Sequence, residues 1–127
     1  MKVVLDTSTL IFWTLDPVSL SQAARQAISS ADQCIVSSIS LWEIGTKQRK
    51  GKLSLPGTFL EYVKRAKSIR MLEILAVDTE IWVSSVELPW QHNDPADRVI
   101  VATAEILNAP LLASDSQIRA FYSRTIW

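Results

Sequence analysis

The sequence predicts a single α/β domain in which a mainly parallel β-sheet is covered by helices on both faces. Short hydrophobic runs alternate along the chain with longer segments whose hydrophobic residues recur at helical spacing. Strands that alternate with helices in this way favour a parallel sheet buried between helical layers. Four acidic residues also lie where a hydrophobic run ends or a helical segment begins: Asp6, Glu43, Asp97 and Asp115.

The composition indicates one domain that covers residues 1–127. Of these residues, 48% are hydrophobic and 20% are charged, which is enough for one substantial core. The formal net charge is zero, so a nucleic-acid interface would have to depend on local basic patches. The single cysteine, Cys34, excludes a disulfide framework and a structural zinc site. We expect a cytoplasmic protein without a signal peptide, because Asp6 interrupts the N-terminal run early and no run reaches membrane-spanning length.

The first half of the chain is expected to form two strands and four helices. In order, these are a strand at 3–5, a short helix around 10–13, a helix at 19–31, a strand at 33–37, a helix from about 40 to 51, and a helix at about 56–69. β-Branched residues mark the first strand, and Gly51 is well placed to end the third helix. The expected inward stripe of the fourth helix is Phe59, Leu60, Val63 and Ala66.

The second half is expected to contain three strands and three helices. In order, these are a strand at 71–77, a helix at 78–88, a loop to residue 93, a helix from Asp94-Pro95 to about Leu107, a strand at 110–113, a helix at 116–121, and an edge strand at 122–127. Pro95 suits the first turn of its helix. The helix at 78–88 is expected to turn Ile81, Trp82, Ser85 and Val86 to one face.

The four acids are expected to meet at one edge of the sheet. The turns that follow parallel strands converge there, and such folds bind ligands at this edge. Neighbouring carboxylates cannot all stay ionised without a cation. Magnesium prefers oxygen ligands and needs only one or two direct carboxylates, with others holding its waters. The pattern therefore predicts a site for magnesium, or for manganese in its place.

Each acid also has a structural explanation, because a side-chain oxygen at a helix N-terminus accepts hydrogen bonds from exposed backbone N–H groups. The candidates are Asp6 as a cap, Ser40 with Glu43 as a capping box, Asp94 as a cap with Asp97 in the first turn, and Asp115 as a cap in competition with Ser114 or Ser116. A helix cap requires only one acceptor, and it does not require the acids of different helices to lie close together. Convergence of all four acids would therefore favour the metal site.

Four ordered segments carry a resemblance to a known family across essentially the whole chain. They are Leu5-Asp6-Thr7-Ser8 with the apolar residues 10–13, residues 38–44, the string from His92 to Arg98 followed by residues 100–104, and Leu112-Ala113-Ser114-Asp115. Together they resemble the PIN-domain ribonucleases, and within these the VapC toxins of bacterial toxin–antitoxin pairs. The His-x-Asp-Pro-x-Asp-Arg string is the most specific part. Ala96 replaces a frequent phenylalanine and Ser114 a frequent threonine, but neither departure removes a carboxylate.

The resemblance implies a three-layer α/β/α PIN-like fold with a central parallel sheet of about five strands. It also implies a metal-dependent endoribonuclease, with Asp6 and Asp97 as the most direct ligands of Mg²⁺ or Mn²⁺. Glu43 and Asp115 would complete the catalytic acidic pocket and hold the metal through its waters. The implied partners are an RNA substrate, a VapB-like antitoxin that covers the site, and a second copy in a homodimer.

Other polar residues near the acids have two explanations each. Thr7, Ser8 and Ser114 are candidates for positioning a water or the scissile phosphate, or they are ordinary turn hydroxyls. His92, the only histidine, is a candidate general base or a loop hydrogen-bonding residue. Arg98 is expected to pair with a phosphate or with a neighbouring acid.

Two basic clusters are candidates for contacts with an RNA backbone, or they are solvated helix faces. The first contains Lys47, Arg49, Lys50 and Lys52, and the second contains Lys64, Arg65, Lys67 and Arg70. Most of the five tryptophans are expected to fill the core. Trp13 and Trp42 are expected to line a groove for a partner segment.

Three other functions fit the sequence less well. A haloacid-dehalogenase-type phosphatase needs a second aspartate two residues after Asp6, where Ser8 stands. A phosphoacceptor receiver domain needs an adjacent pair of N-terminal acids and a late lysine, and this chain has neither. A catalytically inert PIN-fold protein-interaction domain is the main alternative, although such a domain has no need of four convergent acids.

Overall fold

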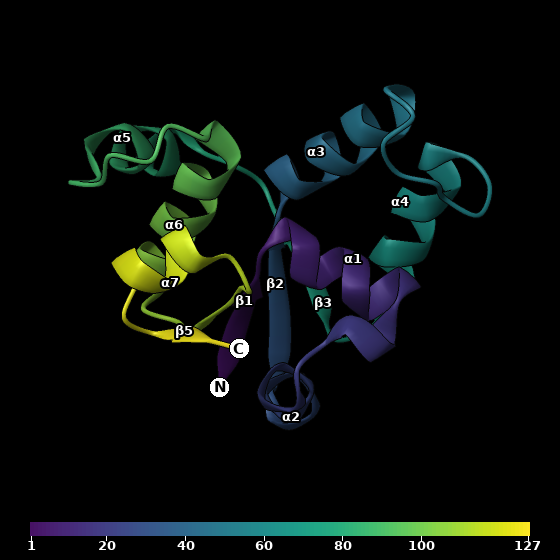
Figure 1. Ribbon diagram of the computed structural model, residues 1–127, viewed down its shortest axis with the longest axis horizontal. Helices are drawn as coiled ribbons and strands as arrows, with labels where there is room; N and C mark the ends of the chain where they lie inside the picture. Colours follow the sequence, from purple (N-terminus) through teal and green to yellow (C-terminus); the bar gives the residue numbers. More distant parts are fainter.

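The computed structural model describes residues 1–127 and contains a five-stranded parallel sheet between two layers of helices (Figure 1). The strands are β1 (Lys2–Leu5), β2 (Gln33–Ser37), β3 (Leu72–Leu75), β4 (Leu111–Leu112) and β5 (Thr125–Ile126). Their order in the sheet is β3-β2-β1-β4-β5, and every neighbouring pair is parallel. The predicted three-layer α/β/α class is therefore confirmed.

Seven α-helices and one short 3₁₀ helix connect the strands. They are α1 (Thr7–Leu15), η1 (Pro17–Ser19), α2 (Gln22–Ser30), α3 (Ser38–Arg49), α4 (Phe59–Ser68), α5 (Thr79–Glu87), α6 (Pro95–Leu107) and α7 (Ser116–Phe121). In Figure 1 the helices α5, α6 and α7 lie on one side of the sheet, and α1 and α4 lie on the other. None of these helices is long and apolar enough to cross a membrane.

The hydrophobic core lies in two halves, one on each face of the sheet. Val3 and Leu5 of β1 face one half, which is completed by α1, α2 and α4, while Val4 faces the half formed by α5, α6 and α7. This alternation follows from the two-residue period of a strand. All three side chains are fully buried. Because β1 is central and covered on both faces, the residue that follows it is held in a fixed position.

Two expected helix faces are wrong in detail. In α4, Leu60 is 61% exposed, and Tyr62 takes the inward position with Ala66. In α5, Ile81 and Ser85 are buried as expected, but Trp82 and Val86 are exposed. Hydrophobic spacing identifies the inward face of a helix, but the packing of the folded chain decides which residues of that face are buried.

The third helix begins two residues earlier than expected. Its N-cap is Ser37, whose side chain accepts a hydrogen bond from the backbone N–H of Ile39. The expected capping box of Ser40 and Glu43 is therefore wrong, and both side chains are available for other contacts. Gly51 has a positive φ of 72°, which suits its expected place just after the end of this helix.

Candidate acidic active site

The four predicted acids all lie on segments that reach the carboxyl edge of the sheet. Asp6 follows β1 and is the N-cap of α1, while Asp115 follows β4 and is the N-cap of α7. Glu43 lies in the second turn of α3, and Asp97 lies in the first turn of α6. In Figure 1 the strands β1 and β2 run upward, toward the start of α1 and of α3.

Asp6 is the most buried acid of this group, with 4% of its surface exposed. Its Oδ1 accepts the backbone N–H of Thr9 at 2.8 Å, so the predicted cap exists. Burial raises the pKa of Asp6 to about 6. The charges of Asp97 and Glu43 also raise it, whereas hydrogen bonding from Thr9 lowers it. A buried carboxylate with a raised pKa is more typical of a functional site than of a simple cap.

Glu43 is held by the hydroxyl of Thr7, which donates to Glu43 Oε1. The Thr7 hydroxyl also lies 2.8 Å from the Ser40 hydroxyl. Burial is the main cause that raises the pKa of Glu43, and the charges of Asp94 and Asp97 act in the same direction. Hydrogen bonding from Thr7 and the charge of Lys47 oppose this effect. Thr7 therefore joins the N-terminus of α1 to the side of α3 that faces the acids.

Asp97 is half-buried and pairs with His92, whose Nε2 lies 2.7 Å from Asp97 Oδ2. Burial raises the pKa of Asp97, hydrogen bonding from His92 lowers it, and the charges of Asp94 and Asp115 raise it. The N-cap of α6 is Asp94, which accepts the backbone N–H of Asp97 at 3.0 Å. The carboxylate of Asp97 is therefore not needed as a cap, and the loop hydrogen bond expected of His92 is made to this acid.

Asp115 lies at the exposed rim of the acidic group. Its Oδ1 accepts the backbone N–H groups of Gln117 and Ile118, so Asp115, and not Ser114 or Ser116, caps α7. Its charge nevertheless reaches Asp97. The charges of Asp94 and Asp115 raise the pKa of Asp97, and the charge of Asp97 in turn raises the pKa of Asp6 and of Glu43.

Arg98 differs from both expectations, because it pairs with neither an acid nor an exposed anion site. Its guanidinium donates to five backbone carbonyl oxygens at 2.6 to 3.0 Å, those of Ser85, Val86, Leu88, Trp90 and His92. These carbonyls belong to the end of α5 and to the loop that leads to α6. Arg98 thus fixes the loop that carries His92, a role with no signal in the sequence.

Only some of the remaining predicted site residues lie beside the acids. Ser8 and Ser114 are half-buried beside Asp6 and Asp115 but hydrogen-bond to neither acid. Of the first basic cluster, Lys47 is close enough to Glu43 for its charge to lower the pKa of that acid. Three of its members are exposed near the far end of α3: Arg49, Lys50 and Lys52.

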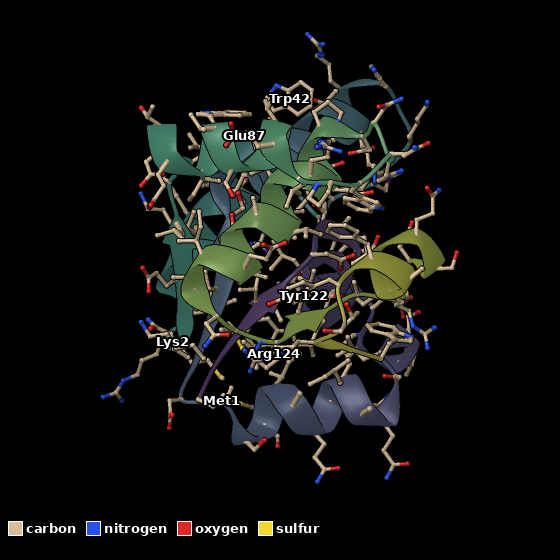
Figure 2. The ribbon with its side chains drawn as sticks, turned by 90° about the vertical axis from the view of Figure 1, so that its left-hand side faces the viewer. Met1, Lys2, Trp42, Glu87, Tyr122 and Arg124 are labelled. Carbon is tan, nitrogen blue, oxygen red and sulfur yellow. The ribbon has the colours of Figure 1, made fainter.

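A groove of about 670 Å³ adjoins the acids between α3 and α5. Trp42 and Trp82 line it with Ile39 and Val77, and Glu43 and Asp94 form part of its wall. Trp42 is 65% exposed and stands at the outer surface near the top of Figure 2. Trp42 therefore lines a groove, as expected, and the partner segment that would fill it stays a prediction. Trp13 does not line this groove but packs against the core and lines other cavities.

The donor chemistry of the site fits a hard divalent cation. All four acids offer oxygen, the preferred ligand of Mg²⁺, and only one oxygen of Asp6 is used by the protein. No three of the acidic, histidine or cysteine side chains lie close enough together to surround one ion. An ion held directly by two of these carboxylates would keep waters in the rest of its coordination shell.

Replacing Asp6 by asparagine is expected to raise the free energy of unfolding of the metal-free protein by about 1 to 3 kcal/mol at pH 8. Asparagine keeps an oxygen for the Thr9 N–H and removes the buried charge. The folded-state pKa of Asp6 is about 6 against an ordinary 3.8. The folded state therefore binds the proton more tightly, and wild-type stability falls as the pH rises from about 4 to 6.

Urea unfolding in EDTA at pH 8 and at pH 4 measures this effect. The gain should appear at pH 8 and vanish at pH 4, where Asp6 is largely protonated in the folded wild type. Asp115→Asn, at an exposed cap, is the matched control and should show no gain. An equal gain from Asp6→Asn at both pH values would show that charge is not the cause.

The fold and the acids together define a class of protein. It is a three-layer α/β/α domain with a carboxylate-rich centre at the carboxyl edge of its parallel sheet. The family described as PIN domain matches residues 3–123. The chain belongs to the PIN-domain family.

The chain resembles proteins named as VapC and a protein from a toxin-antitoxin complex. The chain is 31% identical over 120 residues to Ribonuclease VapC22 of Mycobacterium tuberculosis, a match that covers 93% of this chain and 90% of the relative. Among solved structures, it is similar to a toxin-antitoxin complex from Klebsiella pneumoniae, with a TM-score of 0.67 and 20% identity over 98% of this chain and 96% of the other. VapC20 of Mycobacterium tuberculosis, described as a Sarcin-Ricin loop cleaving toxin, gives a TM-score of 0.63 and 17% identity over 93% of each chain.

Proposed function

We propose that this protein is an endoribonuclease that acts as the toxin of a toxin–antitoxin pair and hydrolyses RNA phosphodiester bonds at the acidic centre. The observation that carries the proposal is the group formed by Asp6, Glu43 and Asp97, three acids whose pKa values burial raises. They stand in a PIN fold, and a relative of similar length is a ribonuclease. A site with this electrostatic cost to the fold is expected to serve chemistry.

Magnesium, or manganese in its place, is the proposed cofactor. Asp6 and Asp97 would hold it directly, while Glu43 and Asp115 would act through its waters. When bound, the ion supplies charge stabilisation on the phosphate and lowers the pKa of a coordinated water. The support is the all-oxygen donor set and the mutual repulsion of the acids, which a cation would relieve.

The protein's own residues orient these acids before the substrate arrives. Thr7 holds Glu43, and His92 holds Asp97. Such support limits the motion of the acids, which catalysis by positioning requires. Beyond the acids, the proposed RNA-backbone contacts are Lys47, Arg49, Lys50 and Lys52, and Ser8 and Ser114 are proposed to position a water or phosphate.

Two protein partners are proposed, a VapB-like antitoxin and a second copy of the chain. The structures similar to this chain include complexes named as toxin-antitoxin and VapBC assemblies. The groove between α3 and α5 supports protein contact, because the exposed Trp42 and Trp82 line it. Exposed apolar residues gathered in this way are typical of interaction surfaces.

The direct test is incubation of total cellular RNA with the purified, antitoxin-free protein in Mg²⁺ or Mn²⁺, beside an EDTA control. Discrete fragments are expected with metal and none with EDTA, because the acids alone provide no compensation for the charge of the phosphate. Fragments in EDTA would contradict the metal dependence. No cleavage by well-folded protein with either ion would favour an inert interaction domain.

A further inference from the structure

A shallow hollow of about 480 Å³ lies beside the acidic centre, on the side of α7. Its wall consists of Trp90, Gln91, His92 and Asn93 from the loop before α6, with Gln117 and Ala120 from α7. We refer to these six residues as the amide hollow. Apart from His92, which holds Asp97, the residues of this hollow have no role in the proposed hydrolysis of a phosphodiester bond.

The amide hollow shares residues with the acidic centre. His92, on its wall, lies 2.7 Å from Asp97 through Nε2. Gln117 donates its backbone N–H to Asp115 at 2.8 Å. A group in the hollow would therefore lie next to a phosphate held at the acids.

Packing and hydrogen bonds fix the part of the wall formed by Trp90 and His92. Trp90 stacks on Phe121 with ring centroids 4.8 Å apart and planes inclined by 12°, and its ring also lies 4.8 Å from that of His92. Arg98 donates to the backbone oxygens of Trp90 and His92 at 2.6 and 2.9 Å. Rings that are already held in place lose little entropy when they contact a ligand.

The chemistry of the amide hollow suits a neutral, planar, polar group. Gln91, Asn93 and Gln117 are exposed, and each amide offers both a donor and an acceptor. Neither lysine nor arginine lines the hollow, so it has no fixed cation for a phosphate. Unpaired RNA bases are recognised by hydrogen bonds to their edges and by contact with aromatic or histidine rings. The amides and the Trp90 and His92 rings supply both kinds of contact.

We infer that the amide hollow binds one unpaired nucleobase that neighbours the scissile phosphate, and so sets the sequence preference of cleavage. The inference rests on the proposed ribonuclease function. It assigns base recognition to Gln91, Asn93 and Gln117, which lie outside the acidic centre. It also limits the substrate to RNA that is single-stranded at the cleaved position.

The test is cleavage of a single-stranded RNA oligonucleotide pool with a randomised segment, in Mg²⁺ or Mn²⁺, with the fragment ends sequenced. Wild type is compared with Gln91→Ala, Asn93→Ala and Gln117→Ala. Gln26→Ala is the matched control, because Gln26 is an exposed glutamine on α2. That helix lies at the bottom of Figure 1, away from the start of α1 and of α3. Thermal unfolding of each variant confirms that the fold is retained.

Wild type and Gln26→Ala should show the same preference at one nucleotide beside the cleaved bond. At least one variant in the hollow should flatten that preference and lower kcat/KM for the preferred RNA roughly tenfold. Cleavage with the wild-type preference in all three variants would overturn the inference and leave the ribonuclease function standing. Absence of cleavage by wild type itself would overturn the proposed function and this inference together.

Discussion

Asp97→Asn is expected to reduce the metal-dependent cleavage of RNA by at least about a hundredfold while the fold is retained. The asparagine would keep the shape of the side chain but lose the charge that the proposed cation requires. The helix should not suffer, because Asp94 and not Asp97 caps α6. Stability should not fall for electrostatic reasons either, since burial raises the pKa of Asp97 and so disfavours its charge.

Initial rates with a fluorescent single-stranded RNA, measured in Mg²⁺ and in Mn²⁺, provide the comparison. Asp78→Asn is the matched control, because Asp78 caps α5 through its side chain and is exposed. That variant should cleave at the wild-type rate. A wild-type rate in Asp97→Asn would refute the assignment of this residue to the catalytic centre.

Arg98→Met is expected to lower the free energy of unfolding by about 3 to 5 kcal/mol. Methionine replaces part of the apolar stem but leaves five carbonyl oxygens without the guanidinium that binds them. Hydrogen bonds from a charged donor are stronger than neutral ones, and several are lost at once. The loop that carries Trp90 and His92 should loosen with them.

Urea unfolding followed by tryptophan fluorescence measures the loss. Arg98→Lys should recover only part of the stability, because a single ammonium cannot reach five carbonyls arranged around a planar guanidinium. Arg70→Met, at an exposed arginine, should change stability by less than about 0.5 kcal/mol. An unchanged urea midpoint in Arg98→Met would show that this network contributes little to the fold.

Asp97 and Arg98 are adjacent in α6, but their side chains have different surroundings. Asp97 carries a partly buried carboxylate, and burial and the charges of Asp94 and Asp115 raise its pKa. Arg98 ties the preceding loop to the same helix through five hydrogen bonds. The loop that carries His92, the partner of Asp97, is therefore held by contacts outside the acidic centre.

Local sequence patterns predicted most of the elements correctly. The strand at 33–37, the helix at 116–121 and the caps at Asp6, Asp94 and Asp115 are all present. Such features depend on neighbours within a few residues, where side-chain spacing and backbone hydrogen bonding are set. The same reasoning failed for Ser40 and Glu43, whose spacing fits a capping box but whose partner is Thr7.

The sequence by itself determined the alternation of strands and helices, and with it the positions of the four acids near one edge of a parallel sheet. Only the tertiary structure decided the environment of each acid: Asp6 buried, Glu43 held by Thr7, Asp97 paired with His92, and Asp115 left exposed. It also decided that Arg98 binds carbonyl oxygens. The physical reason is that every backbone offers the same carbonyls and that burial depends on segments remote in the chain, so neither is encoded in a local pattern.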